Sequence, residues 1–366
     1  MSAKNSILIK AKMMKNLNLL PEIEPVDLTS FSIMKQRLLI TSEGFEKRSL
    51  SFLSQEIEVF FNKVIVCKYR PSKESRYDEL INLLERRCST ETINDIVFSR
   101  FEPFSFEIEM QDHLLNCSGI FDEIVLDISV MSKYMIMQIL CLLKEYTGTL
   151  RIIYTEPMQY VPLQELPFID EQSNAVSLPS TGVQNIIKTP LLTSLIMQQS
   201  PSLLVSFLSF NEQLIRVLLS ECNPSRILLI NGVPPHIPWR EKAMNNIHKN
   251  IIKEYCHDNP VDENGLLERK CSTLYYAETF KLLASIYKSF GEDYRIILSP
   301  TGSKMQAVGS SLIKNCCEDI HIEYPTPESY YVNGYSSSEI REIHQILFVD
   351  FKEHVQNLSA QYELNG

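Results

Sequence analysis

Short apolar runs alternate with amphipathic stretches along the first half of the chain. Five runs rich in β-branched and aliphatic residues predict buried strands: Arg37–Thr41, Lys63–Cys67, Asp95–Ser99, Glu123–Ile128 and Leu150–Tyr154. Segments with helical spacing follow the first four runs: Ser49–Phe61, Arg76–Cys88, Phe106–Asn116 and Ser132–Tyr146. Strands that alternate with helices of this length favour a parallel sheet covered on both faces.

The same pattern returns after residue 200. It predicts strands at Leu203–Leu208, Arg226–Asn231, Leu267–Ser272, Tyr294–Ser299 and Ile320–Tyr324. The predicted helices between them are Glu212–Glu221, Trp239–Cys256, Tyr275–Phe290 and Lys304–Asn315. Two further segments have helical spacing, Asn185–Met197 before this region and Ser338–Gln361 after it.

The two halves also match in sequence. IIYTEPMQY (152–160) parallels IEYPTPESY (322–330), LDISVMSK (126–133) parallels LSPTGSK (298–304), and GFEKRSLSFL (44–53) parallels SFNEQLIRVL (209–218). These matches occur in the same order, so we expect an α/β protein with two tandem Rossmann-like parallel-sheet units from an internal duplication. The predicted boundaries are an N-terminal strap (1–36), a first unit (37–160), a proline-rich connector (161–200), a second unit (201–335) and a C-terminal helical tail (336–366).

Composition narrows the class of protein. The 366 residues carry 45 Asp and Glu against 35 Lys and Arg, a net charge of −10, which argues against bulk binding of duplex nucleic acid. No run of about 18 uninterrupted apolar residues predicts a membrane span. The nine cysteines form no C-x-x-C pair and no zinc-like spacing with histidine, so we expect reduced thiols, a cytoplasmic location and no metal site. No cofactor is identified, although a nucleotide-type ligand remains compatible with the chain.

Ligands of open parallel sheets bind outside the carboxyl ends of the strands. One such end is the turn Thr301-Gly302-Ser303-Lys304, preceded by Ser299. A small-residue turn that opens a helix, with a lysine, suits an anion or nucleotide. The alternative is a structural turn in which Ser303 caps the helix.

The matching end in the first half carries Asp127, Ser129 and Lys133. It lacks the glycine, and its acid stands where the other half has Ser299, so recognition of a hydroxyl or amine is expected there. The alternative is a capped helix with a solvated Lys133.

A third end follows the first predicted strand and contains Ser42, Glu43, Glu46 and Arg48. Arg48 could hold a phosphate or carboxylate with two hydrogen bonds. Acids near a helix start also simply complement its dipole. Together with Asp127, the two glutamates are the candidates for acid–base catalysis.

Tyr324 ends the last predicted strand of the second half, and Tyr330, Tyr331 and Tyr335 lie nearby. These rings could stack on a base, although aromatic residues in such loops also pack on neighbouring loops. No G-x-S-x-G or G-x-G-x-x-G motif is present, which disfavours the corresponding hydrolases and oxidoreductases.

The strand, the TGSKM turn and the helix around Ile297–Met305 resemble the glycine-rich turn of CARF domains. CARF domains are Rossmann-like sensors of cyclic oligonucleotides in prokaryotic antiviral defence, and SAVED domains resemble two such units fused in one chain. The resemblance implies that Ser299 and Thr301 to Lys304 contact the ligand and that the loop 41–48 faces the same pocket. The sequence departs from the pattern because Gly302 is the turn's single glycine and the first half reads DISVMSK.

Three functions therefore stay open. The first is a nucleotide- or cyclic-oligonucleotide-binding sensor or adaptor that acts through a partner protein, in keeping with antiviral defence. The second is a nucleotide-processing hydrolase that uses Glu or Asp with Lys and Arg at the strand ends. The third is a structural subunit of a multiprotein defence complex, which docks a partner through the strap and the tail.

Overall fold

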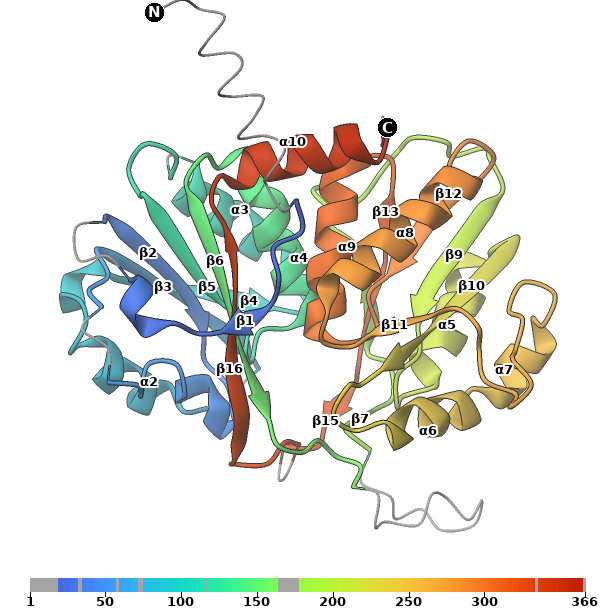
Figure 1. Ribbon diagram of the computed structural model, residues 1–366, viewed down its shortest axis with the longest axis horizontal. Helices are drawn as coiled ribbons and strands as arrows, with labels where there is room; N and C mark the ends of the chain where they lie inside the picture. The colour runs from blue at the N-terminus through green and yellow to red at the C-terminus, as the bar shows by residue number, and fades with distance from the viewer. Residues whose placement is uncertain are drawn as a thin grey trace, which may run out of the picture.

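The computed structural model describes residues 19–31, 35–56, 59–71, 75–115, 117–163, 178–332 and 335–364. Most strands belong to two sheets that stand beside each other, with helices between and around them (Figure 1). The chain is therefore a mixed α/β protein with a large, mostly parallel sheet, as predicted.

The larger sheet has the strand order β1-β16-β6-β5-β2-β3-β4. Its parallel part is built from the first half of the chain, and every predicted strand of that half is present: β2 (Arg37–Ser42), β3 (Lys63–Arg70), β4 (Ile93–Ser99), β5 (Glu123–Asp127) and β6 (Thr149–Pro157). β2 and β5 are buried along their whole length, which explains their continuous apolar sequences.

A buried cluster of one carboxylate and two guanidinium groups links three neighbouring strands of this sheet. Glu123 on β5 is fully buried and accepts from Nε of Arg37 on β2 and Nε of Arg151 on β6, both at 2.8 Å. Arg151 also donates to Gln345 Oε1 at 2.5 Å. The paired charges therefore join β2, β5 and β6 to the strand that carries Gln345.

The smaller sheet has the order β11-β10-β9-β12-β13, all parallel. Its strands come from the second half, close to their predicted positions: β9 (Ser202–Phe207), β10 (Arg226–Val233), β11 (Lys270–Ser272), β12 (Arg295–Ser299) and β13 (His321–Ile322). Counted along each half, the five parallel strands of the two sheets are connected in the same spatial order, 3-2-1-4-5.

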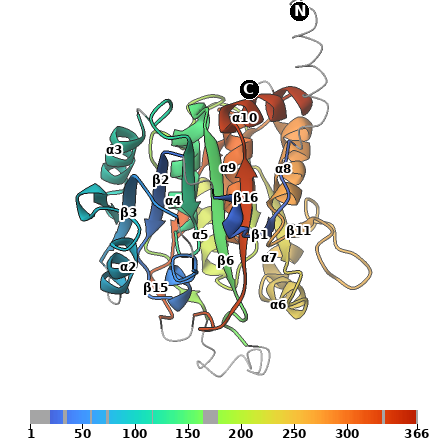
Figure 2. The same ribbon diagram turned by 60° about the vertical axis from the view of Figure 1, so that its left-hand side comes forward.

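The helices are mostly those expected, and their bounds shift by a few residues. They are α2 (Tyr77–Leu84), α3 (Pro103–Leu114), α4 (Lys133–Leu142), α5 (Gln213–Cys222), α6 (Trp239–Ile247), α7 (Lys249–Glu254), α8 (Tyr276–Phe290), α9 (Lys304–Cys316) and α10 (Phe351–Gln361). α4 and α9 lie against each other between the two sheets (Figures 1 and 2), and Asn315 Nδ2 donates to Leu140 O across the pair at 3.0 Å.

The described residues also form four short 3-10 helices: η1 (Leu28–Ser30), η2 (Lys47–Leu50), η3 (Thr90–Thr92) and η4 (Leu143–Glu145). The helix predicted for Ser49–Phe61 was wrong, because only η2 forms at its start. After η2, Ser54 N donates to Leu50 O at 2.8 Å and Gln55 N donates to Phe52 O at 3.2 Å, so residues 51–55 form turns and no regular helix.

The helical tail was correct only from Phe351 onward. Residues Ile340–Phe348 form β16, which pairs antiparallel with β6, with a register shift between Ile340 and Glu342. The open edge of β6 offers backbone partners to a β-branched segment, and this pairing outweighs the helical spacing. Part of the predicted tail is therefore a strand of the larger sheet.

The strap and the connector also contribute short strands. β1 (Glu24–Pro25) pairs with β16, whereas residues 1–18 of the strap lie outside the described residues. In the connector, β7 (Ser180–Thr181) pairs with β15 (Ser329–Tyr330), and β8 (Asn185–Ile187) pairs with β14 (Tyr324–Thr326). The helix predicted at Asn185–Met197 was wrong, because Pro190 interrupts it and β14 offers a pairing edge.

Candidate ligand-binding site

A cavity of about 490 Å³ lies where the carboxyl ends of the two sheets meet. The strands β6 and β9 point toward the lower edge of Figure 1, and the segments that follow the strands of both sheets line the cavity. Nine predicted site residues are part of this lining: Glu43, Glu46, Arg48, Lys133, Thr301, Gly302, Ser303, Lys304 and Tyr324. Residues far apart in the sequence are therefore brought to one place.

The other four candidates are buried at the strand ends and do not line the cavity: Ser42, Asp127, Ser129 and Ser299. Asp127 accepts the backbone N–H of Ser129 at 3.0 Å, and Ser129 Oγ in turn accepts the N–H of Thr155 at 2.9 Å. Burial raises the pKa of Asp127 to about 6, against the hydrogen bonds from Ser129 that lower it. These residues therefore lie buried beneath the cavity lining and do not face a ligand.

Each of the two lysines at the helix starts donates hydrogen bonds to the other half of the chain. Lys133, the first residue of α4, donates from Nζ to the carbonyls of Thr301 and Gly302, both at 3.0 Å. Lys304, the first residue of α9, donates from Nζ to Met131 O at 2.6 Å. Each lysine therefore reaches the turn that precedes the other lysine's helix.

Neither ammonium group has a carboxylate partner within ion-pair distance in the described part of the chain. Burial lowers the pKa of Lys304 to about 7, and repulsion from Arg48 and Lys133 adds to the effect, while Glu46 and Asp127 oppose it. Burial lowers the pKa of Lys133 to about 8. Both cations are thus held at a cost in free energy that an anionic ligand would offset.

The turn before α9 is built mainly as a helix cap. Ser303 Oγ accepts from Gln306 N at 3.0 Å, and Gln306 Oε1 accepts from Ser303 N at 2.8 Å, which is a capping box. A Cβ on Gly302 would clash with Gln306 Oε1, so the glycine gives this cap its room. Thr301 Oγ1 donates to Phe207 O at 2.5 Å and so ties the turn to β9. The alternative of a structural turn that caps α9 therefore accounts for Thr301, Gly302 and Ser303.

Arg48 is engaged within the protein. Its Nε donates to Glu46 Oε2 at 2.8 Å, its Nη1 donates to Thr155 O at 2.9 Å, and the residue is 1% exposed. Burial favours the uncharged forms, but the mutual attraction lowers the pKa of Glu46 and raises that of Arg48. Glu43 accepts from Tyr69 N at 2.8 Å and from Ser75 Oγ at 2.6 Å. Both glutamates, which were predicted as acid–base candidates, are thus tied to structural partners.

Aromatic rings stand at the same end of the molecule. Tyr335 lies edge-on to Phe45, Tyr160 and Tyr330, with ring centroids 5.9 to 6.5 Å apart. Tyr330 is 43% exposed, whereas Tyr324 is buried and packs on Tyr134 at 5.6 Å. Stacking on a base therefore suits the rings around Tyr335 better than Tyr324.

Three further cations of the cavity were not among the predicted residues: Arg70 at the end of β3, Arg100 and Arg240. Arg240 on α6 is buried and donates to the carbonyls of Tyr160 and Pro162, both at 3.1 Å, and burial lowers its pKa to about 10. Arg100 donates to the carbonyls of Pro327 and Glu328 at 2.9 and 3.1 Å. Arg100 directly follows β4, so applying the strand-end rule to every strand would have found it. The pattern around Arg240 gives no such signal.

The charged lining of the cavity is more basic than the chain. It comprises six Lys and Arg side chains and four Glu side chains: Arg48, Arg70, Arg100, Lys133, Arg240 and Lys304 against Glu43, Glu46, Glu156 and Glu328. The cavity therefore carries a small positive excess within a protein of net charge −10. This local charge suits an anionic ligand.

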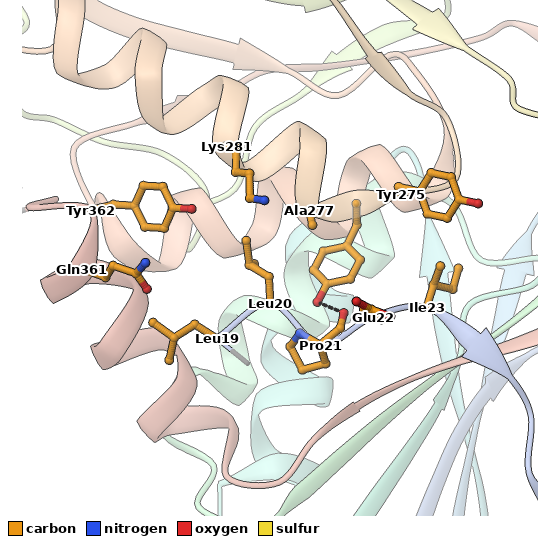
Figure 3. A pocket seen from close by; sticks show the side chains of 11 residues that line it. Leu19, Leu20, Pro21, Glu22, Ile23, Tyr275, Ala277, Lys281, Gln361 and Tyr362 are labelled. Carbon is orange, nitrogen blue, oxygen red and sulfur yellow. Dashed lines mark hydrogen bonds between the residues drawn. The ribbon is translucent and has the colours of Figure 1, made fainter. Parts of the chain in front are cut away.

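A second hollow, of about 560 Å³, lies between the segment Leu19–Ile23, the start of α8 and the end of α10 (Figure 3). Tyr276 donates there to Pro21 O at 2.7 Å, and Lys281 and Glu22 supply one charge of each sign. It contains none of the predicted site residues, so the chemistry is concentrated in the cavity between the sheets.

Within the described residues, no group of three or more His, Cys, Asp or Glu side chains could hold a metal ion. No helix of that part of the chain combines the length and apolar character needed to cross a bilayer.

No known family model and no curated protein matches this chain. Among solved structures, the cytoplasmic domain of a prokaryotic cation chloride cotransporter is similar at a TM-score of 0.22 and 11% sequence identity. The likeness covers 81% of this chain and 98% of that one. Likeness at this level says nothing about the ligand of the present chain.

Proposed function

We propose that this protein binds an anionic, nucleotide-type ligand in the cavity between its two sheets. The observation that carries the proposal is the set of four cations, Lys133, Lys304, Arg100 and Arg240, whose hydrogen-bond partners are backbone carbonyls. A phosphate would replace these neutral acceptors with charged oxygens, and such hydrogen bonds are roughly twice as strong.

The size and the rim of the cavity favour a nucleotide over a simple inorganic anion. A volume of about 490 Å³ lies within the range of small-molecule sites. The rings of Phe45, Tyr160, Tyr330 and Tyr335 provide surfaces on which a base could stack. The ligand would thus use its phosphates on the cations and its base on the rings.

We also infer that the two halves arose by duplication. The equal strand order of the two sheets supports this, as do Ser132 and Ser303, which cap α4 and α9 directly before their lysines. A ligand bound at the joint would sense the position of one half against the other. This agrees with the resemblance to CARF and SAVED domains, and with a role as a sensor or adaptor that passes a cyclic-oligonucleotide signal of antiviral defence to a partner protein.

Titration calorimetry with a panel of mononucleotides, dinucleotides and cyclic oligonucleotides tests the proposal. We expect at least one ligand to bind the wild type and to lose affinity at least tenfold in Lys133→Met and Lys304→Met. Lys314→Met is the matched control, because Lys314 is also buried on α9 and donates to a carbonyl, Glu318 O at 2.7 Å, but lies outside the cavity. A panel without any binder, or equal losses in the control, would contradict the proposal.

A further inference from the structure

A histidine and a glutamate from different halves meet in the wall of the cavity. His236 belongs to the loop after β10, and Glu156 lies near the end of β6. Nδ1 of His236 is 2.9 Å from Oε1 of Glu156. Pro235 and Pro238 flank the histidine closely and restrict the backbone of its loop. The imidazole is therefore held in place from both its backbone and its side chain.

Glu156 is kept ionised by its surroundings. Oε2 accepts from Nε2 of His344 at 3.1 Å, and Nε of Arg341 is 3.9 Å from Oε1. Burial would raise the pKa of Glu156, but the hydrogen bonds from His344 and His236 hold it below its usual range. An ionised carboxylate can only accept, so Nδ1 of His236 carries a proton, and in the neutral imidazole the lone pair is on Nε2.

The two histidines on Glu156 differ in what they leave open. The His344 side chain is 6% exposed and has carboxylates at both nitrogens, with Glu342 Oε2 at 3.5 Å from Nδ1. The His236 side chain is 36% exposed, and its Nε2 has no partner within the described part of the chain. A purely structural ion pair explains His344 fully, but it does not account for the free nitrogen of His236 in a cavity wall.

An imidazole in a cavity wall that is oriented by a largely buried carboxylate at one nitrogen, with no partner at the other in the described residues, has the arrangement of a general base. Lys133, Lys304 and Arg240 line the same cavity and could stabilise the negative charge that develops on a phosphoryl group. A base and three cations therefore line the same cavity.

We propose that the cavity hydrolyses a phosphodiester of its nucleotide ligand, with His236 as the catalytic base and Glu156 as its positioning residue. This rests on the proposed function, because the ligand must first bind. Nε2 takes a proton from a water molecule, and the water oxygen forms a bond to phosphorus while the bond to the leaving oxygen breaks. The leaving oxygen departs with that electron pair and takes the proton from Nε2, which gives a phosphate monoester and an alcohol and restores the neutral imidazole.

The test follows turnover of the nucleotides that bind in calorimetry, with products identified by mass spectrometry. The p-nitrophenyl ester of thymidine 5′-monophosphate serves as a chromogenic diester in parallel. We expect His236→Asn, which can still donate to Glu156, to lose at least 100-fold in kcat while the Kd of the ligand stays within about twofold. Glu156→Gln should lower kcat with little change in KM, which a merely structural role would not produce. His257→Asn is the control, since that side chain is 95% exposed and lies outside the cavity.

Each outcome bears on one of the two proposals. Binding without turnover, or turnover that is unchanged in His236→Asn, overturns the hydrolysis and leaves the binding function standing. A chain that binds no member of the panel overturns the binding function and the hydrolysis with it. Turnover that depends on His236, with binding that does not, supports both.

Discussion

Replacing Lys304 with methionine should make the folded protein more stable. Burial lowers the pKa of this lysine from its ordinary 10.5 to about 7, which corresponds to about 5 kcal/mol of unfavourable free energy for the charged form. The side chain is half-buried, so water screens part of this cost, and the variant loses the hydrogen bond to Met131 O, worth about 1 kcal/mol. A net gain of about 1–3 kcal/mol at neutral pH remains.

The gain should also depend on pH with a defined sign. The folded protein releases the Lys304 proton near pH 7 and the unfolded chain near pH 10.5, so the unfolded chain binds more protons between these values. The stability of the wild type therefore rises with pH across this window, and the advantage of Lys304→Met shrinks as the pH approaches 10.

Urea unfolding of both proteins at several pH values between about 6.5 and 10 measures this difference. Lys242→Met, a change of an exposed lysine on α6, should alter stability by no more than about 0.5 kcal/mol at each pH. If Lys304→Met instead destabilises the protein by an amount that does not vary with pH, the lysine has a structural role. The reasoning that it is strained in favour of a ligand would then be refuted.

Three further predictions concern the sheet, the turn before α9 and the ligand. Glu123→Ala should lower the free energy of unfolding by about 3–5 kcal/mol in urea titrations, because it leaves Arg37 and Arg151 buried without their shared carboxylate. Gly302→Ala should cost about 1–2 kcal/mol by displacing Gln306 from the capping box, and should weaken ligand binding less than loss of either cavity lysine, which calorimetry measures. The affinity for an anionic ligand should fall as the pH rises above about 7 and about 8, the pKa values of Lys304 and Lys133, because each lysine then loses its charge. Each lysine should contribute a loss of up to tenfold per pH unit. A flat affinity profile between about pH 6 and 9 would contradict their role.

The parallel strands could be predicted from the sequence because most of them are short, buried runs rich in β-branched and aliphatic residues. β16 could not, since residues 340–348 carry a helical spacing that is overridden only by the free edge of β6, a partner about 190 residues away. The connector behaved likewise, because β8 depends on β14. Pairing with a distant strand determines the secondary structure of both segments, and the local sequence does not predict that pairing.

The strand-end rule predicted some residues of the site and missed others, because it gives no information on side-chain partners. The strand-end rule located Lys133 and Lys304, because each directly follows a capping serine at the end of the short turn after a strand. It could not show that Arg48 would be neutralised by Glu46, two residues away, nor that Arg240, in the first turn of α6, would reach the same cavity. Those facts depend on side-chain partners that only the assembled sheets bring together.

The structure of the protein with its tightest-binding nucleotide tests the central claim most directly. We predict a phosphate oxygen within hydrogen-bond distance of Nζ of Lys133 and of Lys304, with the bonds of both lysines to the backbone carbonyls broken. A nucleotide found elsewhere, for example in the hollow beside Leu20 and Tyr362, with the crossed lysine contacts intact, would contradict it.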